Sequence, residues 1–396
     1  MRRPLALLLA ALLALAGCAP AAPGGTSSTP GSLSSPDLSA AQSQPDPEPQ
    51  PEPVPEPDPR QAAVDLLLSN MTLEEKVGQL FFARCPSMHA AALASEYHLG
   101  GYILFGRDFQ DKTRAEVTAD IAAYQRAADL PLLIGVDEEG GTVVRVSSNP
   151  ELAPRRFRSP QELALASSGQ GDVFAEDARE KSGLLLGLGI NVNFAPVADV
   201  STDPADFIHD RTLGQDAQAT AGYVASVVGA MEESRIGSVL KHFPGYGNNA
   251  DTHTGIAVDQ RPYDSFETSD FLPFEAGIDA GADAVLVSHN IVTCMDGELP
   301  ASLSPEVHRV LREELGFDGV VLTDDLAMDA IDQYAETGSA AVLALQAGND
   351  MVVTTDFTQQ IPQVLQALAD GTLSQEVIDR AAARVLGWKY DLGLLS

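Results

Sequence analysis

The chain alternates short apolar runs with helical patterns between residues 61 and 396. Near-continuous apolar strands that are separated by helices indicate a parallel sheet covered on both faces. Eight repeats of a strand followed by a helix predict an α/β fold that closes into a (β/α)8 barrel of the TIM type. The eight predicted strands lie within residues 78–83, 100–105, 130–136, 190–197, 237–243, 282–288, 319–324 and 349–353.

Local signals place two helix starts between these runs. Thr72 and Glu75 form a capping-box pattern just before the first run, and Ser304-Pro305 opens the helix that precedes the seventh. Roughly 335 residues without a second linker are enough for one large core or for two closely packed domains. The count of eight runs favours a single barrel domain over residues 61–396.

The N-terminal segment has the layout of a secretory signal, with two arginines before an apolar run that is too short to span a membrane comfortably. Leu15-Ala16-Gly17-Cys18 resembles the bacterial lipobox, in which the cysteine is acylated and becomes the new N-terminus. We therefore expect residues 1–17 to be a lipoprotein signal peptide and Cys18 to carry a lipid. The alternative is an ordinary signal with an incidental cysteine.

Residues 18–60 are rich in proline, serine and acidic residues and show no apolar periodicity. Such a segment cannot bury enough surface to fold. Alternating proline and like charge favour an extended, semi-rigid spacer. We predict a disordered stalk that holds the barrel away from the outer face of the cell membrane, to which the protein is attached only through its lipid.

The formal net charge of −32 argues against nucleic acid or anionic lipid as a partner. Beyond Cys18 the chain has only Cys85 and Cys294, whose spacing is not that of a zinc site. These two cysteines could form a disulfide or remain isolated buried thiols. We expect a monomer.

Polar residues directly follow five of the predicted strands. In a barrel of this type the active site is built from the C-terminal ends of the strands, so these residues are expected to meet. A single charged residue at a strand end is usually the first solvated position of a loop, but five such clusters in register favour a site. The clusters contain Asp137, Glu138, Glu139 and Arg145; Asp199, Asp210 and Arg211; Lys241, His242, Asp251 and His253; Ser288, His289 and Asn290; and Asp324 and Asp325.

These residue types suit the hydrolysis of a glycosidic bond. Hydrolysis with retention needs a carboxylate at the anomeric carbon and an acid/base at the leaving oxygen. Carboxylates accept hydrogen bonds from sugar hydroxyls, whereas Lys and Arg only donate them, so a mixture of both suits a neutral polyol. Chemistry alone does not rank Asp324 above Asp325 as the nucleophile.

The motifs VDEEGG, DRTLG, KHFPGYG, DTH, PASLSP and VLTDDLAM occur in this order. In this respect the chain resembles the family-3 glycoside hydrolases, specifically their single-domain bacterial β-N-acetylhexosaminidases, over essentially all of residues 61–396. The resemblance implies a (β/α)8 barrel and a two-step retaining mechanism without metal or cofactor. The implied reaction removes terminal β-linked N-acetylglucosamine, and fragments of peptidoglycan are the expected substrates.

The resemblance also assigns the catalytic residues. Asp324 matches the family nucleophile, and Asp325 matches a structural neighbour of it. His253 matches the acid/base, held by Asp251 two residues earlier. An imidazole has an unperturbed pKa near 6.5, and a nearby carboxylate can orient it and favour its protonated form.

Substrate-binding positions follow from the same resemblance, and the chain departs from the family at two places. Tyr246 stands where the family usually has His, and Thr142 where it commonly has Arg, which leaves the preference for the leaving group open. His289 is expected either to line the pocket or to pack behind it. The remaining sugar-binding residues implied are Asp137, Arg145, Arg211, Lys241 and His242.

Three other functions remain open at this stage. A metal-dependent hydrolase could use His242, Asp251, His253 and His289 as ligands. A phosphorylase could use the same site with phosphate as the acceptor, because a histidine acid/base would not repel it as a carboxylate would. A non-catalytic lipoprotein could retain the sugar pocket as a receptor, although the complete set of strand-end residues argues against this.

Overall fold

The computed structural model describes residues 58–167, 172–252, 255–331, 334 and 339–395. The predicted signal peptide, acylated Cys18, most of the predicted stalk and His253 lie outside the described residues. Among the described helices, none combines the length and apolar character needed to cross a membrane.

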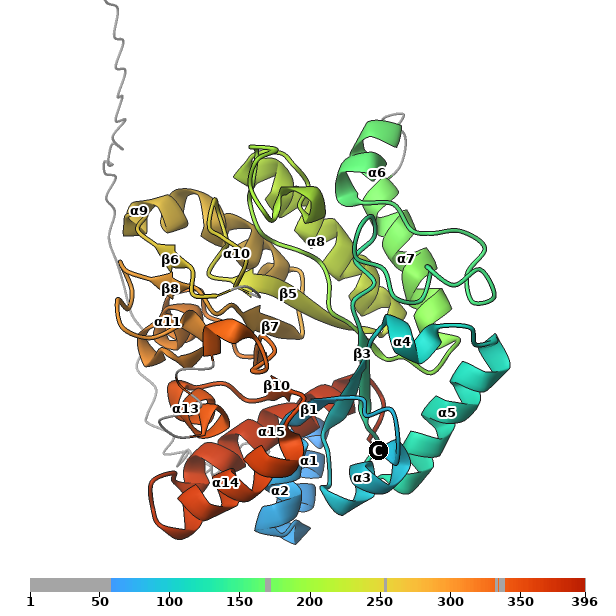
Figure 1. The fold of residues 1–396 in the computed structure, drawn as a ribbon, viewed down its shortest axis with the longest axis vertical. Coiled ribbons are helices and arrows are strands. Elements are labelled where there is room, and N and C mark those ends of the chain that lie inside the picture. The colour runs from blue at the N-terminus through green and yellow to red at the C-terminus, as the bar shows by residue number, and fades with distance from the viewer. Residues whose placement is uncertain (1–57, 168–171, 253–254, 332–333, 335–338, 396) are drawn as a thin grey trace, which may run out of the picture. The chain divides into compact units, whose positions relative to one another are not determined.

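Eight parallel strands form the barrel that the apolar runs predict, and each strand overlaps one of those runs (Figure 1). The order around the sheet is β10-β1-β2-β3-β4-β5-β7-β9, and a parallel bridge from Leu322 to Met351 links β9 to β10. The fold prediction is confirmed. The strands are β1 Phe81–Arg84, β2 Gly101–Leu104, β3 Leu133–Val136, β4 Val192–Asn193, β5 Gly237–Phe243, β7 Ala284–Val287, β9 Val320–Thr323 and β10 Val352–Thr354.

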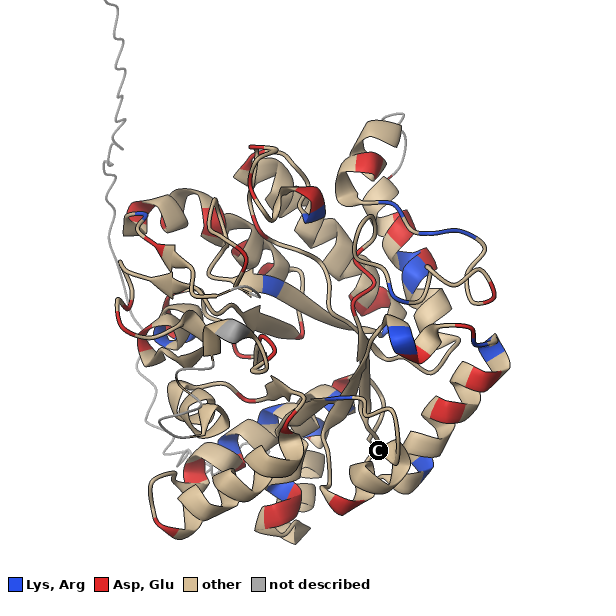
Figure 2. Cartoon of the chain, viewed as in Figure 1, with Lys and Arg blue, Asp and Glu red and all other residues tan. Residues whose placement is uncertain are grey.

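Helices surround the barrel on its outer side (Figure 1). Figure 2 shows that acidic residues are scattered over these helices and the loops between them. A separate two-stranded pair, β6 Val258–Asp259 and β8 Ile291–Val292, was not predicted, because two residues are too few to show a pattern. The helices are α1 Pro59–Asn70, α2 Leu73–Gln79, α3 Ala90–Glu96, α4 Gly106–Phe109, α5 Arg114–Ala127, α6 Pro160–Ala166, α7 Val173–Leu186, α8 Ala217–Ser234, α9 Tyr263–Ser265, α10 Phe271–Asp279, α11 Pro305–Arg309, α13 Ala340–Ala347, α14 Phe357–Ala369 and α15 Gln375–Asp391.

Both predicted helix starts are present. Thr72 and Glu75 exchange side-chain and backbone hydrogen bonds at the start of α2. Ser304 accepts the N–H of Val307 at the start of α11, where Pro305 occupies the first turn. These caps satisfy N–H groups that the first turn of a helix leaves without partners.

The first described helix, α1, includes the last two residues of the predicted stalk. Asp58 caps α1 by accepting the N–H of Arg60, and Pro59 provides a backbone angle suited to the first turn. The guanidinium of Arg60 pairs with Asp391 at the end of α15, at 2.8 Å. Pro59 and Arg60 therefore belong to the barrel domain.

The two cysteines within the described residues form no disulfide with each other. Cys85 is buried next to β1, and burial raises the pKa of its thiol to about 12. Cys294 is exposed rather than buried, which differs from the expectation of two buried thiols.

Lys389, in the last helix, is buried against the residues that precede the first strand. Lys389 of α15 is fully buried, and its ammonium group donates to the side-chain oxygen of Gln79 at 2.6 Å. The amide nitrogen of Gln79 donates in turn to the carbonyl of His98. Burial lowers the pKa of Lys389 from 10.5 to about 7. A charged lysine is therefore costly at this position.

We expect Lys389→Met to stabilise the protein near neutral pH, by about 1 to 3 kcal/mol. The unfolded chain keeps this proton up to about pH 10.5, whereas the folded protein releases it near 7. Between these values the unfolded state binds more protons, so the native protein gains stability as pH rises and loses it as pH falls. The difference in unfolding free energy between pH 6.5 and pH 9, measured with urea, should be smaller for Lys389→Met than for the wild type.

Lys112→Met is a suitable control, since the Lys112 side chain is one-third exposed and pairs with an exposed Asp120. It should change stability by less than about 1 kcal/mol at both pH values. A Lys389→Met protein that is less stable than the wild type at pH 6.5 would contradict this account of the buried lysine.

Candidate active site

A cavity of about 580 Å³ opens at the C-terminal ends of the barrel strands. Seven residues that the sequence predicted for the site line it together, although they come from four different strand ends. This is the expected position of the active site in a barrel of this type. The seven are Asp137, Arg145, Arg211, Lys241, His242, Asp251 and Asp324.

The segment after β3 is held in place by a buried carboxylate, Glu138. It accepts the backbone N–H groups of Arg145 and Val146 at 2.9 and 2.7 Å. The side chain of Asn193, from β4, bonds both the N–H and the carbonyl of Glu138. These bonds fix the segment between two strands, so Arg145 enters the cavity from a rigid base.

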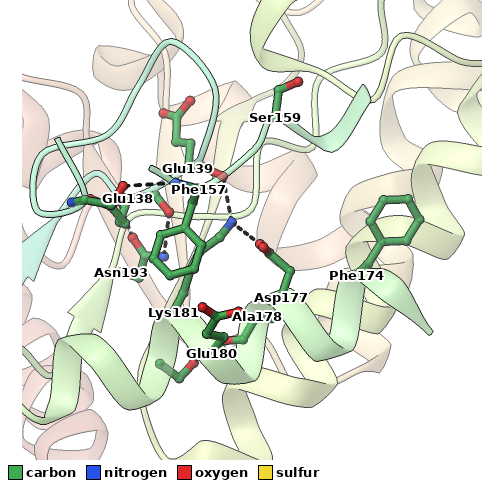
Figure 3. Close-up of polar contacts among 12 residues, drawn as sticks. Glu138, Glu139, Phe157, Ser159, Phe174, Asp177, Ala178, Glu180, Lys181 and Asn193 are labelled. Atoms are coloured by element: carbon green, nitrogen blue, oxygen red, sulfur yellow. Dashed lines mark hydrogen bonds and ion pairs between the residues drawn. The ribbon is translucent and has the colours of Figure 1, made fainter. Parts of the chain in front are cut away.

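A second support reaches the same segment from outside the barrel. Figure 3 shows Lys181 of α7 between Asp177 and the backbone of Glu139. Its ammonium pairs with Asp177 at 2.9 Å and donates to the Glu139 carbonyl at 2.8 Å. Lys181 thereby connects helix α7 to Glu139, the carboxylate that pairs with two cations of the cavity.

Glu139 joins two cations from different strands. Its carboxylate receives two hydrogen bonds from Arg211, at 2.8 and 3.0 Å, and pairs with Lys241 at 2.7 Å. Lys241 also pairs with Asp137 at 2.6 Å. Burial alone would raise the pKa of Glu139, but the charges of Arg211 and Lys241 outweigh it and hold the pKa well below its usual range.

His242 is oriented by the buried carboxylate of Asp199. One oxygen of Asp199 accepts Nδ1 of His242 at 2.7 Å and the His242 backbone N–H at 3.1 Å. Arg211 donates to Nε2 at 3.2 Å. Because Arg can only donate, Nε2 acts as the acceptor in this contact, and Nδ1 is the nitrogen that donates to Asp199.

An irregularity in β5 brings two consecutive side chains into the cavity. Side chains on a regular strand alternate between its faces, so Lys241 and His242 would normally point to opposite sides. The register between β5 and β7 shifts between Lys241 and Phe243. Such a shift re-aims side chains next to active sites, and both residues line the cavity.

Asp324 follows β9 directly and is half-buried in the cavity. Its N–H donates to the carbonyl of Val287 on β7, and one carboxylate oxygen accepts the N–H of Asp325 at 2.8 Å. Asp325 also lines the cavity. Burial raises the pKa of Asp325, and the neighbouring charge of Asp324 raises it further.

His289 lies behind this segment and does not line the cavity. Its side chain is fully buried, Nδ1 bonds the hydroxyl of Ser302 at 2.7 Å, and Nε2 bonds the carbonyl of Asp325 at 3.0 Å. Of the two expectations for His289, the structure places it in the packing position. It supports the turn that carries Asp324 and Asp325.

Tyr246 connects the His242 region to the segment that carries Asp251. Its ring meets the imidazole of His242 edge-on at 5.1 Å, and its N–H donates to Asp199 at 2.7 Å. Its hydroxyl bonds that of Thr252, the neighbour of Asp251. Burial raises the pKa of Tyr246, followed by the charge of Asp324, so the phenol stays protonated.

Four contributors to the site were not assigned from the sequence. Glu139 and Asp199 were noted as strand-end acids, but their partners lie 72 and 43 residues away, and no local pattern reveals them. Arg84 and Phe105 line the cavity at the ends of β1 and β2. The strand-end rule that identified the other residues would also have found these two.

Two residues named as ligands for the metal-dependent alternative are already engaged. His242 bonds Asp199 and Arg211, and His289 bonds Ser302 and the Asp325 carbonyl. In the part of the chain that the structure describes, no three histidine, cysteine or acidic side chains are arranged to hold a metal ion.

Glu139→Gln should destabilise the protein by roughly 3 to 5 kcal/mol, because it leaves two buried cations without their shared counter-charge. The variant can be compared with the wild type by the midpoint of urea unfolding. Glu180→Gln serves as the control, since Glu180 pairs with Arg155 at the surface and should contribute less than about 1 kcal/mol. Equal midpoint shifts for both variants would contradict a central role for Glu139.

Comparisons with known proteins identify the family of this chain. A model of the glycosyl hydrolase family 3 N terminal domain matches residues 72–387. The beta-hexosaminidase of Xanthomonas campestris pv. campestris (strain B100) is 35% identical over 300 residues, which cover 73% of this chain and 87% of that protein. Beta-hexosaminidase LpqI of Mycobacterium tuberculosis is 35% identical over 312 residues, covering 76% of this chain and 78% of that protein.

The fold has a solved counterpart in a glycoside hydrolase family 3 beta-N-acetylglucosaminidase from Paenibacillus sp., with a TM-score of 0.75 and 32% identity. The similarity covers 82% of this chain and 63% of that one, so this chain spans less than two thirds of the Paenibacillus protein. The family match covers most of the barrel domain, and the related proteins are hydrolases of hexosaminides. The chain is a glycoside hydrolase of the beta-hexosaminidase type and belongs to glycosyl hydrolase family 3.

Proposed function

We propose that the protein removes terminal, non-reducing β-linked N-acetylhexosamine residues with retention, through a covalent glycosyl-enzyme formed on Asp324. The observation that carries this proposal is the carboxylate of Asp324 at the end of β9, in a cavity shared with Asp137, Lys241 and His242. The likeness to a beta-N-acetylglucosaminidase supports the choice of sugar.

Binding comes first in the proposed reaction. Asp137 accepts hydrogen bonds from sugar hydroxyls, while Lys241, Arg211 and His242 donate or accept at neighbouring positions. The ion pairs to Glu139 hold the two cations before substrate arrives. A site organised in advance loses little conformational entropy on binding, and it can hold the anomeric carbon near Asp324.

In the first chemical step a carboxylate oxygen of Asp324 forms a bond to the anomeric carbon while the bond to the leaving oxygen breaks. His253, oriented by Asp251, gives its proton to that oxygen. In the second step His253 takes a proton from water, the water oxygen bonds the anomeric carbon, and the ester to Asp324 breaks. Because a histidine is either cationic or neutral, it places no second negative charge opposite Asp324 while that carboxylate attacks.

Replacing Asp324 should test the nucleophile directly. We expect Asp324→Ala to lower kcat on an aryl N-acetyl-β-glucosaminide by roughly 10³-fold or more, with an unchanged melting temperature. Asp356→Ala, at an exposed carboxylate that begins α14, should retain the wild-type rate. Proton NMR of the wild-type reaction should show the β-anomer as the first product, as retention requires.

Three results would contradict this proposal. Near-normal turnover by Asp324→Ala would remove the assigned nucleophile. An α-anomer as the first product would show inversion. Sugar 1-phosphate in phosphate buffer, in place of free sugar, would identify phosphorolysis and the phosphorylase alternative.

We also propose that the protein acts outside the cytoplasm, attached to the outer face of the cell membrane by a lipid on Cys18. The support is the lipobox-like sequence that ends at Cys18 and the proline-rich acidic segment after it. A segment of this length could extend on the order of 100 Å as polyproline II. This position would give access to fragments of peptidoglycan that end in N-acetylglucosamine, the natural substrates that we propose.

Cys18→Ala should abolish incorporation of labelled palmitate when the full-length chain is produced in a bacterial host, because no thiol remains to be acylated. Partition into a detergent phase should fall with it. Cys294→Ala, at an exposed cysteine of the barrel domain, should label like the wild type. Undiminished labelling of Cys18→Ala would rule out this anchor.

A further inference from the structure

Three phenylalanines line the cavity in the part of the chain that the structure describes, and they differ in how far each ring is covered. Phe105 lies against two guanidinium groups, whose carbon atoms are 4.2 and 5.9 Å from the centre of its ring. Phe194 is buried and meets Phe82 edge-on at 5.2 Å. Phe207, in contrast, remains 40% exposed. A single exposed apolar side chain is ordinary on a protein surface, but this one lies in the cavity that receives the substrate.

The loop that carries Phe207 is held by hydrogen bonds on both sides of this residue. The carboxylate of Asp206 accepts the hydroxyl of Ser201 at 2.7 Å. The carbonyl of His209 accepts the side-chain amide of Gln161 at 2.7 Å. A ring on a loop that is already fixed loses little conformational entropy when a ligand contacts it.

The contacts of Phe207 place it near the segment with the proposed acid/base. Its ring centre lies 5.9 Å from that of Tyr246, whose hydroxyl bonds that of Thr252. Thr252 follows Asp251, which lines the same cavity as Phe207. An acid/base must be within reach of the leaving oxygen. The group attached to that oxygen therefore lies at the end of the cavity where Phe207 is exposed.

A flat apolar ring is suited to one face of a pyranose sugar. A pyranose with equatorial substituents presents axial C–H groups on its faces, and an aromatic ring removes this apolar surface from water. The side chains proposed to bind the sugar that is removed are of another kind, since Asp137 and Lys241 form a buried ion pair. Charged groups recognise hydroxyls, whereas Phe207 recognises a ring face.

We propose that Phe207 is the platform on which the pyranose ring of the leaving group stacks. The inference rests on the proposed function, because the acid/base segment defines the side of the leaving group. It narrows the substrate class to oligosaccharides, in which the terminal N-acetylhexosamine is attached to a second sugar. Phe207 lies outside the motif DRTLG, which begins at Asp210, so the resemblance to the family does not assign it.

Kinetics on two substrates with matched leaving groups test this platform. Diacetylchitobiose releases a second N-acetylglucosamine, whereas trifluoroethyl N-acetyl-β-glucosaminide releases an alcohol of similar acidity that has no pyranose ring. Similar acidity keeps the demand on the acid/base the same for both. We expect the kcat/KM of the wild type to be at least about 10-fold higher on diacetylchitobiose than on the trifluoroethyl glycoside.

Phe207→Ala should lower kcat/KM on diacetylchitobiose by about 10-fold or more and change it by less than about 2-fold on the trifluoroethyl glycoside. Phe207→Tyr keeps an aromatic ring and should keep the wild-type ratio of the two values. Leu66→Ala is the control, since Leu66 is a 64% exposed apolar residue of α1 and the ratio should not change. Melting temperatures confirm that each variant is folded.

Two results would overturn the proposal. One is a wild type that does not prefer diacetylchitobiose to the trifluoroethyl glycoside. The other is a Phe207→Ala variant with the wild-type ratio, whether both values of kcat/KM fall together or neither falls. Failure of the proposed function is distinguishable from both, because the wild type would then release N-acetylglucosamine from neither substrate.

Discussion

Glu139 accepts two cations that arise from different parts of the barrel, and most of the cavity depends on this carboxylate. Lys241 comes from β5, Arg211 from the segment after β4, and Glu139 from the segment after β3. Two buried positive charges would repel each other without it. Because each cation also contacts a second residue of the cavity, Asp137 or His242, the position of one carboxylate fixes several potential contacts to the sugar.

Asp199 performs a comparable task for the loop that follows β5. Its two oxygens bind the imidazole of His242 and the backbone of Tyr246, so one buried side chain sets both the tautomer of His242 and the course of the loop. Tyr246 then extends this connection to Thr252. Tyrosine is longer than the histidine usual at this position in the family, and its hydroxyl reaches a neighbour of the proposed acid/base. Tyr246, which departs from the family pattern, therefore helps to hold the segments that form the site.

The sequence predicted the barrel well because each strand is a buried apolar run, and such runs are visible without knowledge of their partners. It also predicted seven of the residues that line the cavity, because one rule, the strand end, applies to them. The sequence could not predict in which direction each side chain points. His289 follows β7 as expected but points to Ser302 and the Asp325 carbonyl, while the register shift in β5 turns both Lys241 and His242 inward.

The two sides of the cavity differ in how the charges of their arginine and lysine side chains are balanced. Arg211 and Lys241 carry their own counter-charges and present a nearly neutral surface, which suits hydroxyl groups. Arg84 and Arg145 lie against Phe105 and form no ion pair with the residues that the structure describes. A half-buried charge without a close counter-charge costs solvation energy, and the contact with the aromatic ring offsets part of this cost. The uneven distribution of carboxylates around the barrel mouth therefore makes the side with Arg211 and Lys241 nearly neutral, whereas Arg84 and Arg145 depend on an aromatic ring for their support.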